Sequence, residues 1–295
     1  MSASLPLISV IIPTNNEAGR IETTLQSMML QTYQNLEILV IDDHSTDDTK
    51  EIVERFASQD PRIQYHLLPY HDPKRTHILP HRTQGWRRYD INGGYLGRQY
   101  GFQIAKGSYI TLQDADDASL TNRIEIQYIL SQKYNATLVA TQWMALKENY
   151  LEKKMDLDLV FKEVGEENIV IPPKVTTALA REYKGILMHD WFPHPHIPFI
   201  FKWFPLTRPL FFGGYGSYPG ADNSLFFRRE VVEKVTFRQR DDRIWPNPYG
   251  RGSGRDFAFQ VADTFENSWY FKLPIYLWRT TSSNSDFPGY EKYLI

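Results

Sequence analysis

The stretch YITLQDADDASL, residues 109–120, places three aspartates directly after a short apolar run. Carboxylates this close repel one another unless a positive charge lies among them. Hard divalent cations such as Mg²⁺ and Mn²⁺ prefer oxygen ligands of this kind, commonly together with substrate phosphates. Asp114, Asp116 and Asp117 are therefore predicted metal ligands. Spacing alone leaves a second interpretation open, in which the aspartates decorate a helix N-terminus and interact with its dipole.

The sequence around this stretch alternates between strand and helix patterns. Short β-rich apolar runs predict strands at residues 8–12, 36–41, 63–67 and 109–112. Helical spacing of apolar residues separates them, as in the predicted helix 95–106. This alternation predicts an α/β fold with a mostly parallel, Rossmann-like central sheet and helices on both faces. Because ligands bind at the carboxyl ends of parallel strands, Asp42-Asp43 and the aspartate cluster are expected at one edge.

The second half of the chain is less regular. Residues 191–219 combine many prolines with many aromatics, which excludes a long helix there. The segment 213–220, GGYGSYPG, does not match the dinucleotide fingerprint. Asp256, in the run RGSGRDF, is expected just before a helix. We divide the continuous domain into a nucleotide-binding half, 1–140, and a smaller acceptor-binding half with a carboxyl-terminal tail, 141–295.

Composition excludes several classes of protein. The 295 residues include no cysteine, which rules out disulfides, thiolate metal sites and a cysteine nucleophile. The net charge of −2 argues against a nucleic-acid partner. The amino-terminal residues lack the basic region of a signal peptide, and no run approaches the roughly 18 apolar residues of a membrane span. We expect a cytoplasmic protein with at most peripheral contact to the cytoplasmic face of the membrane.

Five blocks of sequence, in order, resemble the glycosyltransferases of family 2, which have the GT-A fold. The blocks are ISVIIPTNNE, TLQSMMLQTYQNLEILVIDDHSTDDT, GRQYGFQIAKGSYITLQDADD, SLFFRRE and GRDF. The resemblance is close over residues 7–133 and looser beyond them. It implies a metal-dependent, inverting enzyme that transfers a sugar from a nucleotide donor, UDP in our prediction, to a hydroxyl of a glycan, lipid-linked glycan or protein.

The same resemblance assigns roles to individual residues. The Asp-x-Asp motif is Asp114-Ala115-Asp116, with Asp116 and Asp117 touching the metal and the donor. Asp43, with Asp42 beside it, matches the carboxylate that contacts uracil. Arg98 is retained from an Ala-Arg-Asn pattern whose neighbours differ here. The first donor-binding loop is matched by Pro13, Thr14, Asn15 and Glu17.

The resemblance also assigns Asp256 as the general base. Such a base takes the proton of the acceptor hydroxyl and typically contributes ~10²–10⁴-fold to the rate. A Mn²⁺ or Mg²⁺ ion stabilises the departing nucleoside diphosphate, and in-line attack inverts the anomeric centre. The residue before Asp256 departs from the usual Glu-Asp pattern and is Arg255. Without the resemblance, Asp256 reads as a helix N-cap.

Two further groups of residues have open interpretations. The basic segment 74–88 is expected to be a loop that either brings Arg87 or Arg88 to a diphosphate or is solvated. The aromatic segment between Trp191 and Tyr218 either walls the core, holds the acceptor or docks on a lipid surface. The residues predicted on the acceptor side are Trp191, Trp203, Tyr215 and Arg255.

Two other functions fit the α/β pattern. One is a non-catalytic relative that binds a nucleotide sugar or a glycan. The other is a sugar nucleotidyltransferase, which usually has a glycine-rich, Lys- or Arg-containing phosphate loop near residue 15. The sequence there, PTNNEAGR, is not such a loop. Release of UDP distinguishes a glycosyltransferase from a nucleotidyltransferase, which releases pyrophosphate.

Overall fold

The computed structural model describes most of the chain. The described residues are 5–70, 76–81, 85–90, 94–184, 197–198, 201–202, 204–211, 219–221, 223–239, 242–245, 252–280 and 289–295; for 76–81 and 85–90 the description is limited to the backbone.

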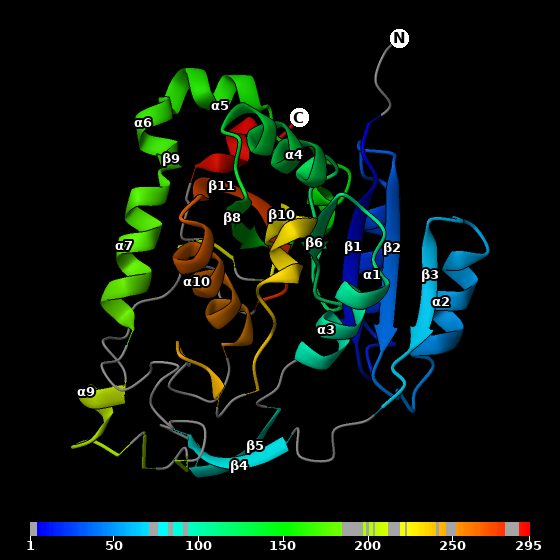
Figure 1. The fold of residues 1–295 in the computed structure, drawn as a ribbon. Coiled ribbons are helices and arrows are strands. Elements are labelled where there is room, and N and C mark those ends of the chain that lie inside the picture. The colour runs from blue at the N-terminus through cyan, green and yellow to red at the C-terminus, as the bar shows by residue number, and fades with distance from the viewer. Residues whose placement is uncertain are drawn as a thin grey trace.

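A nine-stranded mixed sheet forms the centre of the molecule (Figure 1). β1, β2, β3 and β6 run parallel, whereas β10 lies antiparallel between β6 and β8. β8 and β11 are parallel to each other. The order is β3 (Ile63–Leu67), β2 (Leu36–Asp42), β1 (Ile8–Thr14), β6 (Tyr109–Leu112), β10 (Phe226–Arg228), β8 (Leu138–Ala145), β11 (Ser268–Trp278), β7 (Ala118–Ser119), with β9 (Val170–Ile171) also paired to β11. The mostly parallel α/β prediction is confirmed.

Helices pack on both faces of this sheet because successive strand residues point to opposite sides. On β1, Val10 belongs to one hydrophobic cluster and Ile11 to the other. The first cluster includes residues of α1 (Ile21–Met29), α2 (Thr49–Ala57), α4 (Arg123–Lys133) and α5 (Leu157–Val164); the second includes residues of α3 (Tyr95–Ile104), α7 (Pro173–Tyr183), α9 (Arg208–Phe211) and α10 (Ser253–Phe265). Within the described ranges, the remaining helical elements are α6 (Glu166–Ile169) and the 3₁₀ turns Glu148–Tyr150, Arg229–Glu233 and Tyr290–Tyr293.

None of the helices in the described ranges combines the length and the apolar character needed to span a bilayer.

The basic segment predicted as a loop is instead a β-ribbon. β4 (Thr76–His81) and β5 (Gly85–Asp90) pair antiparallel in a sheet of their own. In the view of Figure 1 the ribbon lies beyond the end to which β1, β2 and β3 point. Arg87 and Arg88 belong to β5 and pair with Leu79 and Ile78. Their side chains lie outside the described part of the structure, so their predicted contact with a diphosphate stays a prediction.

A buried glutamate sets where β6 begins relative to β1. The Glu37 carboxylate accepts hydrogen bonds from the Ser9 hydroxyl and the Lys106 amide, both at 2.5 Å, and from the Gly107 amide at 3.2 Å. Gly107 lies so close to β1 that an added Cβ would be 2.6 Å from the Ser9 nitrogen and 2.8 Å from the Leu7 carbonyl oxygen. Since β6 leads directly into the aspartate cluster, this contact positions the site.

Gly107→Ala is expected to lower the free energy of unfolding by about 1–3 kcal/mol, because the methyl group meets backbone atoms that cannot move aside. Urea denaturation measures the change. Gly19→Ala is the matched control, since an added Cβ there meets no atom within 4 Å. Equal stability of the two variants would contradict this account of how β6 is positioned.

Candidate active site

A cavity of about 590 Å³ opens at the carboxyl ends of β1 and β6. This is the edge at which ligands bind in parallel α/β sheets, and the volume suits a small-molecule ligand. The predicted site residues on its wall are Pro13, Thr14, Asn15, Glu17, Asp43, Arg98, Asp114, Ala115 and Asp116. The sequence therefore brings the predicted donor loop and the Asp-x-Asp motif to one cavity.

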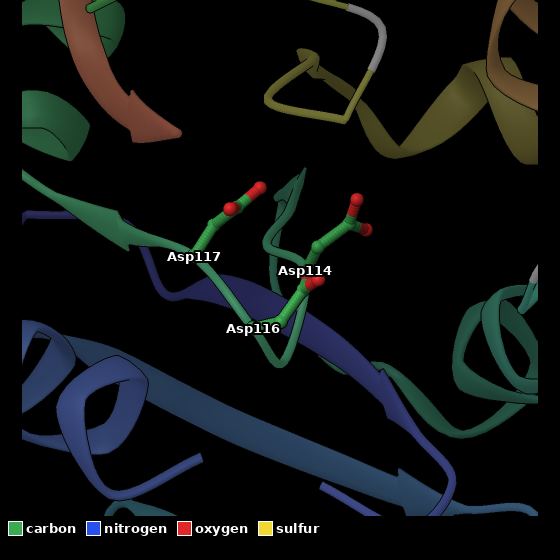
Figure 2. Close-up of side chains that lie close together, drawn as sticks. All are labelled: Asp114, Asp116 and Asp117. Atoms are coloured by element: carbon green, nitrogen blue, oxygen red, sulfur yellow. The ribbon is translucent and has the colours of Figure 1, made fainter. Parts of the chain in front are cut away.

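The three aspartates lie on a single tight turn after β6. Asp114, Asp116 and Asp117 each offer a carboxylate oxygen within 4.8 Å of the others. Figure 2 shows the side chains of Asp114 and Asp117 pointing the same way from this turn. The buried Thr24 hydroxyl of α1 holds the turn by donating to the carbonyl oxygens of Ala115 and Asp117, at 2.8 and 2.6 Å. The turn thus rests on α1.

Asp117 is the most firmly held of the three. It is 1% exposed. Its carboxylate accepts hydrogen bonds from the Tyr276 hydroxyl at 2.8 Å, the Arg279 backbone amide at 2.7 Å and the Asn223 amide at 3.2 Å. All three donors come from the second half of the chain. The two halves therefore meet at this carboxylate.

The other two aspartates have basic neighbours. Asp114 accepts hydrogen bonds from the Arg98 guanidinium and, at 3.2 Å, from the Asn223 amide. Asp116 is 39% exposed at its side chain and lies 3.5 Å from the Arg20 guanidinium. Arg20 also pairs with Glu17 at 2.6 Å. Asp116 thus keeps the most accessible carboxylate of the cluster.

Burial and mutual repulsion disturb the titration of these groups. Burial, followed by the charge of Asp114, raises the pKa of Asp117 to about 8. The same causes raise the pKa of Asp116 above its ordinary value. Burial raises the pKa of Glu17 to about 7, although Arg20 opposes the shift. At neutral pH the cluster binds protons that a cation could replace.

The residues fit a hard divalent cation. Three carboxylates on one turn supply the oxygen ligands that Mg²⁺ and Mn²⁺ prefer. Burial, followed by the charge of Asp114, raises the pKa values of Asp116 and Asp117, so a bound cation would stabilise their ionised forms. Asp114, Asp116 and Asp117 are the ligands that this arrangement offers, with Asp116 facing the cavity most openly.

The paired aspartates after β2 have different surroundings. Asp43 lies on the cavity wall, and its amide donates to the Thr14 carbonyl oxygen at 2.9 Å. Asp42 is 1% exposed and accepts from the Ser45 amide and hydroxyl and from the Tyr65 hydroxyl, at 2.9, 2.6 and 2.8 Å. Asp42 therefore holds the turn after β2, and Asp43 is the carboxylate placed to meet a ligand.

Asp256 lies inside the first turn of α10, which begins at Ser253 rather than after Asp256 as predicted. It is fully buried, and one carboxylate oxygen accepts from the amides of Ile244 and Trp245, at 2.8 and 3.0 Å. The other oxygen accepts from the Gln260 amide at 2.7 Å. Gly252, Ser253 and Gly254, from the same end of the helix, are the residues that line the cavity. Burial raises the pKa of Asp256.

Of the four residues predicted for the acceptor side, the structure describes one. Arg255 is buried, with its guanidinium 5.6 Å from the centre of the Phe259 ring. Trp191, Trp203 and Tyr215 lie outside the described residues. The acceptor roles of all four stay predictions.

Sequence reasoning missed several residues of the site. Asn223 and Tyr276 hold the aspartates, and Trp143 and Trp278 line the same cavity. The nearest signal for Tyr276 is the largely apolar run around it, which indicates burial but not the direction of its hydroxyl. Arg279 also contacts the cluster, since its Nε donates to the Asp116 carbonyl oxygen at 2.8 Å.

A comparison with known families agrees with this geometry. A family model described as glycosyl transferase family 2 matches residues 9–73, which contain the first donor loop and Asp43. Over residues 9–73 this chain is therefore similar to the glycosyltransferases of family 2.

Curated proteins similar to this chain include glycosyltransferases of bacteria. Glycosyltransferase GlyG of Streptococcus pneumoniae is 33% identical over 133 residues, which are 45% of this chain and 38% of GlyG. The GalNAc(5)-diNAcBac-PP-undecaprenol beta-1,3-glucosyltransferase of Campylobacter jejuni is 31% identical over 131 residues, 44% of this chain and 35% of that protein. The matches span less than half of these relatives' own length.

Solved structures agree with the GT-A fold. TarS 1–349 of S. aureus superposes with a TM-score of 0.52 at 14% identity, covering 92% of this chain and 60% of that one. Its complex with UDP-GlcNAc gives a TM-score of 0.53 at 14% identity, covering 94% and 59%. At this identity the likeness shows the fold, and the predicted GT-A architecture is confirmed.

The titration of the cluster makes stability depend on pH. Folding raises the pKa of Asp117 from 3.8 to about 8 and that of Glu17 from 4.5 to about 7, so the folded state holds these protons more tightly than the unfolded state. Their contribution to stability is therefore present below about pH 4 and lost as pH rises through about 8. MgCl₂ is expected to raise Tm more at about pH 8.5 than at about pH 6, where the ion must displace a proton.

Thermal denaturation with and without MgCl₂ measures this difference. Asp117→Asn is expected to reduce the magnesium-dependent rise, whereas Asp48→Asn, an exposed aspartate away from the cavity, serves as the control and keeps it. A rise that is the same at both pH values, or that survives in Asp117→Asn, contradicts the assignment of the metal ligands.

Proposed function

We propose that this chain is a metal-dependent, inverting glycosyltransferase that moves a sugar from a nucleoside diphosphate donor, with UDP as the nucleotide, to a hydroxyl group of a glycan or similar acceptor. The observation that carries the proposal is the aspartate cluster on the wall of a cavity that also contains Asp43 and the first donor loop. The nucleotide sugar bound by the structural neighbour TarS, UDP-GlcNAc, supports the choice of UDP.

Different parts of the cavity wall would contact the nucleotide and the phosphates of the donor. Asp43 and Asn15 lie together at the nucleotide end, since the Asn15 amide donates to the Asp43 carbonyl oxygen at 2.6 Å. The carboxylate of Asp43 is an acceptor for the N–H groups of a base. Arg98 lies on the wall beside Asp114, where a guanidinium suits the phosphates of the donor.

A divalent cation held by Asp114, Asp116 and Asp117 would offset the negative charge of the departing nucleoside diphosphate. The protein's own part is to keep these carboxylates oriented. Tyr276 and Asn223 hold Asp117 in place, and Asn223 also reaches Asp114. Preoriented groups lower the barrier because they need no rearrangement when charge develops.

Asp256 is proposed as the base that takes the acceptor proton. Its raised pKa makes it a stronger base than an ordinary aspartate. In this structure, the backbone amides of Ile244 and Trp245 both donate hydrogen bonds to its carboxylate. The proposal therefore requires that substrate binding opens these contacts.

A donor screen that measures release of UDP or GDP with MnCl₂ tests the activity. Asp116→Asn is expected to lower kcat/KM for metal-dependent release by at least about 100-fold, the scale of losing an electrostatic contact to the transition state. Asp48→Asn is expected to match the wild type. Metal-independent release would contradict the proposal, and release of pyrophosphate would indicate a nucleotidyltransferase.

Asp256→Asn tests the base separately from the fold. Asparagine keeps an oxygen toward the Ile244 and Trp245 amides, and the Gln260 amide can turn to accept from its NH₂ group, although it then loses its hydrogen bond to the Thr236 carbonyl oxygen. Sugar transfer is therefore expected to fall ~10²–10⁴-fold while metal-dependent UDP binding is retained and Tm falls by only a few degrees, about the effect of one lost hydrogen bond. Full transfer activity would remove Asp256 from the mechanism and leave it a structural role at the start of α10.

A further inference from the structure

Two tryptophans line the cavity from β8 and β11, strands that lie on the other side of β6 from β2, which leads to Asp43. Trp143 comes from β8 and Trp278 from the neighbouring strand β11, and both line the cavity. Their ring centres are 4.5 Å apart and the rings are inclined at 76°. In such an edge-to-face pair, the ring that presents its edge has neither face covered by its partner.

Trp278 lies directly beside the groups that hold the aspartate cluster. Tyr276 precedes it by two residues on β11 and donates to the Asp117 carboxylate, and the next residue, Arg279, donates its amide to the same carboxylate. Residues two apart on a strand share a face and are separated by roughly 6.6 Å. Trp278 is therefore close along β11 to the tyrosine that holds Asp117.

The exposure of Trp278 is unusual for so large an apolar side chain at the end of a central strand. It is 39% exposed, whereas Trp245 and Tyr276 are at most 2% exposed. Because Trp278 lines the cavity, its exposed surface is available to a ligand bound there. An apolar surface beside charged carboxylates suits a ligand with both an apolar face and polar edges.

The rest of this wall leaves room for a ring. Gly220, Ala221, Gly252 and Gly254 line it alongside the tryptophans. These residues have at most a methyl side chain, so they add little bulk to the wall. A hexopyranose has this mixed character, because its C–H groups form an apolar face and its hydroxyl groups form a polar rim.

We propose that Trp278, supported by the ring of Trp143, is the stacking surface for the pyranose ring of the acceptor. The inference rests on the proposed function and adds the acceptor class, a hexopyranosyl unit. The nucleotide belongs on the other side of β6, where Asp43 and Asn15 lie, so the tryptophans are left to the sugar that receives the bond.

Saturation-transfer NMR with simple glycosides tests the proposal without a known acceptor. The probes are the methyl β-glycosides of glucose, galactose, mannose and N-acetylglucosamine, added with UDP and MgCl₂. We expect at least one to bind the wild-type chain through its ring C–H groups. Trp278→Ala is expected to weaken that binding at least about tenfold, equivalent to about 1.4 kcal/mol. Trp278→Phe, which keeps an aromatic face, is expected to restore most of it.

Trp269→Ala is the matched control. Trp269 lies on the same strand but packs against Tyr134 and Phe271, away from the cavity, and its replacement is expected to leave glycoside binding unchanged. Calorimetry of UDP binding in every variant separates the two proposals. If the wild type shows no magnesium-dependent UDP binding, that result contradicts the proposed function.

Three results would overturn the stacking proposal while UDP still binds. One is that none of the four glycosides binds the wild type. Another is that Trp278→Ala binds them as well as the wild type does. The last is that Trp278→Ala weakens UDP binding instead, which would give the tryptophan to the nucleotide.

Discussion

Holding three carboxylates with oxygens within 4.8 Å of one another is the constraint on which the site depends. The fold holds these carboxylates with hydrogen-bond donors that come from several different elements. Tyr276 and Arg279 bind Asp117 from β11 and its end, and Asn223 reaches both Asp117 and Asp114. Because each donor is fixed by its own strand or turn, the carboxylates keep their positions despite their repulsion.

A buried guanidinium contributes behind this arrangement. Arg123 is fully buried, 5.9 Å from the centre of the Tyr276 ring. Its hydrogen bonds within the described residues go to the neutral oxygens of Thr111, Leu112 and Gln127. Burying a charge among neutral partners costs free energy. The Tyr276 ring, whose hydroxyl donates to Asp117, therefore lies between this guanidinium and the carboxylate of the cluster.

The sequence predicts the parts of the site that lie close together along the chain. Parallel strands such as β1 and β2 are buried on both faces and appear as continuous apolar runs, so the carboxyl edge and its aspartates could be located. Tyr276 and Asp117 are 159 residues apart, and their contact depends on the pairing of β11 with β7 and β8. No local pattern carries that information. The sequence of β4 and β5 is polar and basic, as in a loop. These strands form a ribbon outside the main sheet, so they lack the continuous apolar pattern of its buried strands.

The placement of β10 bears on how the chain is made. This strand lies between β6 and β8, although both precede it in the sequence. While the ribosome is still synthesising the intervening residues, β6 and β8 each have an unpaired edge of backbone donors and acceptors. The central pairing therefore forms late and over a long chain separation, which slows folding and leaves the nascent amino-terminal region open to association with other strands.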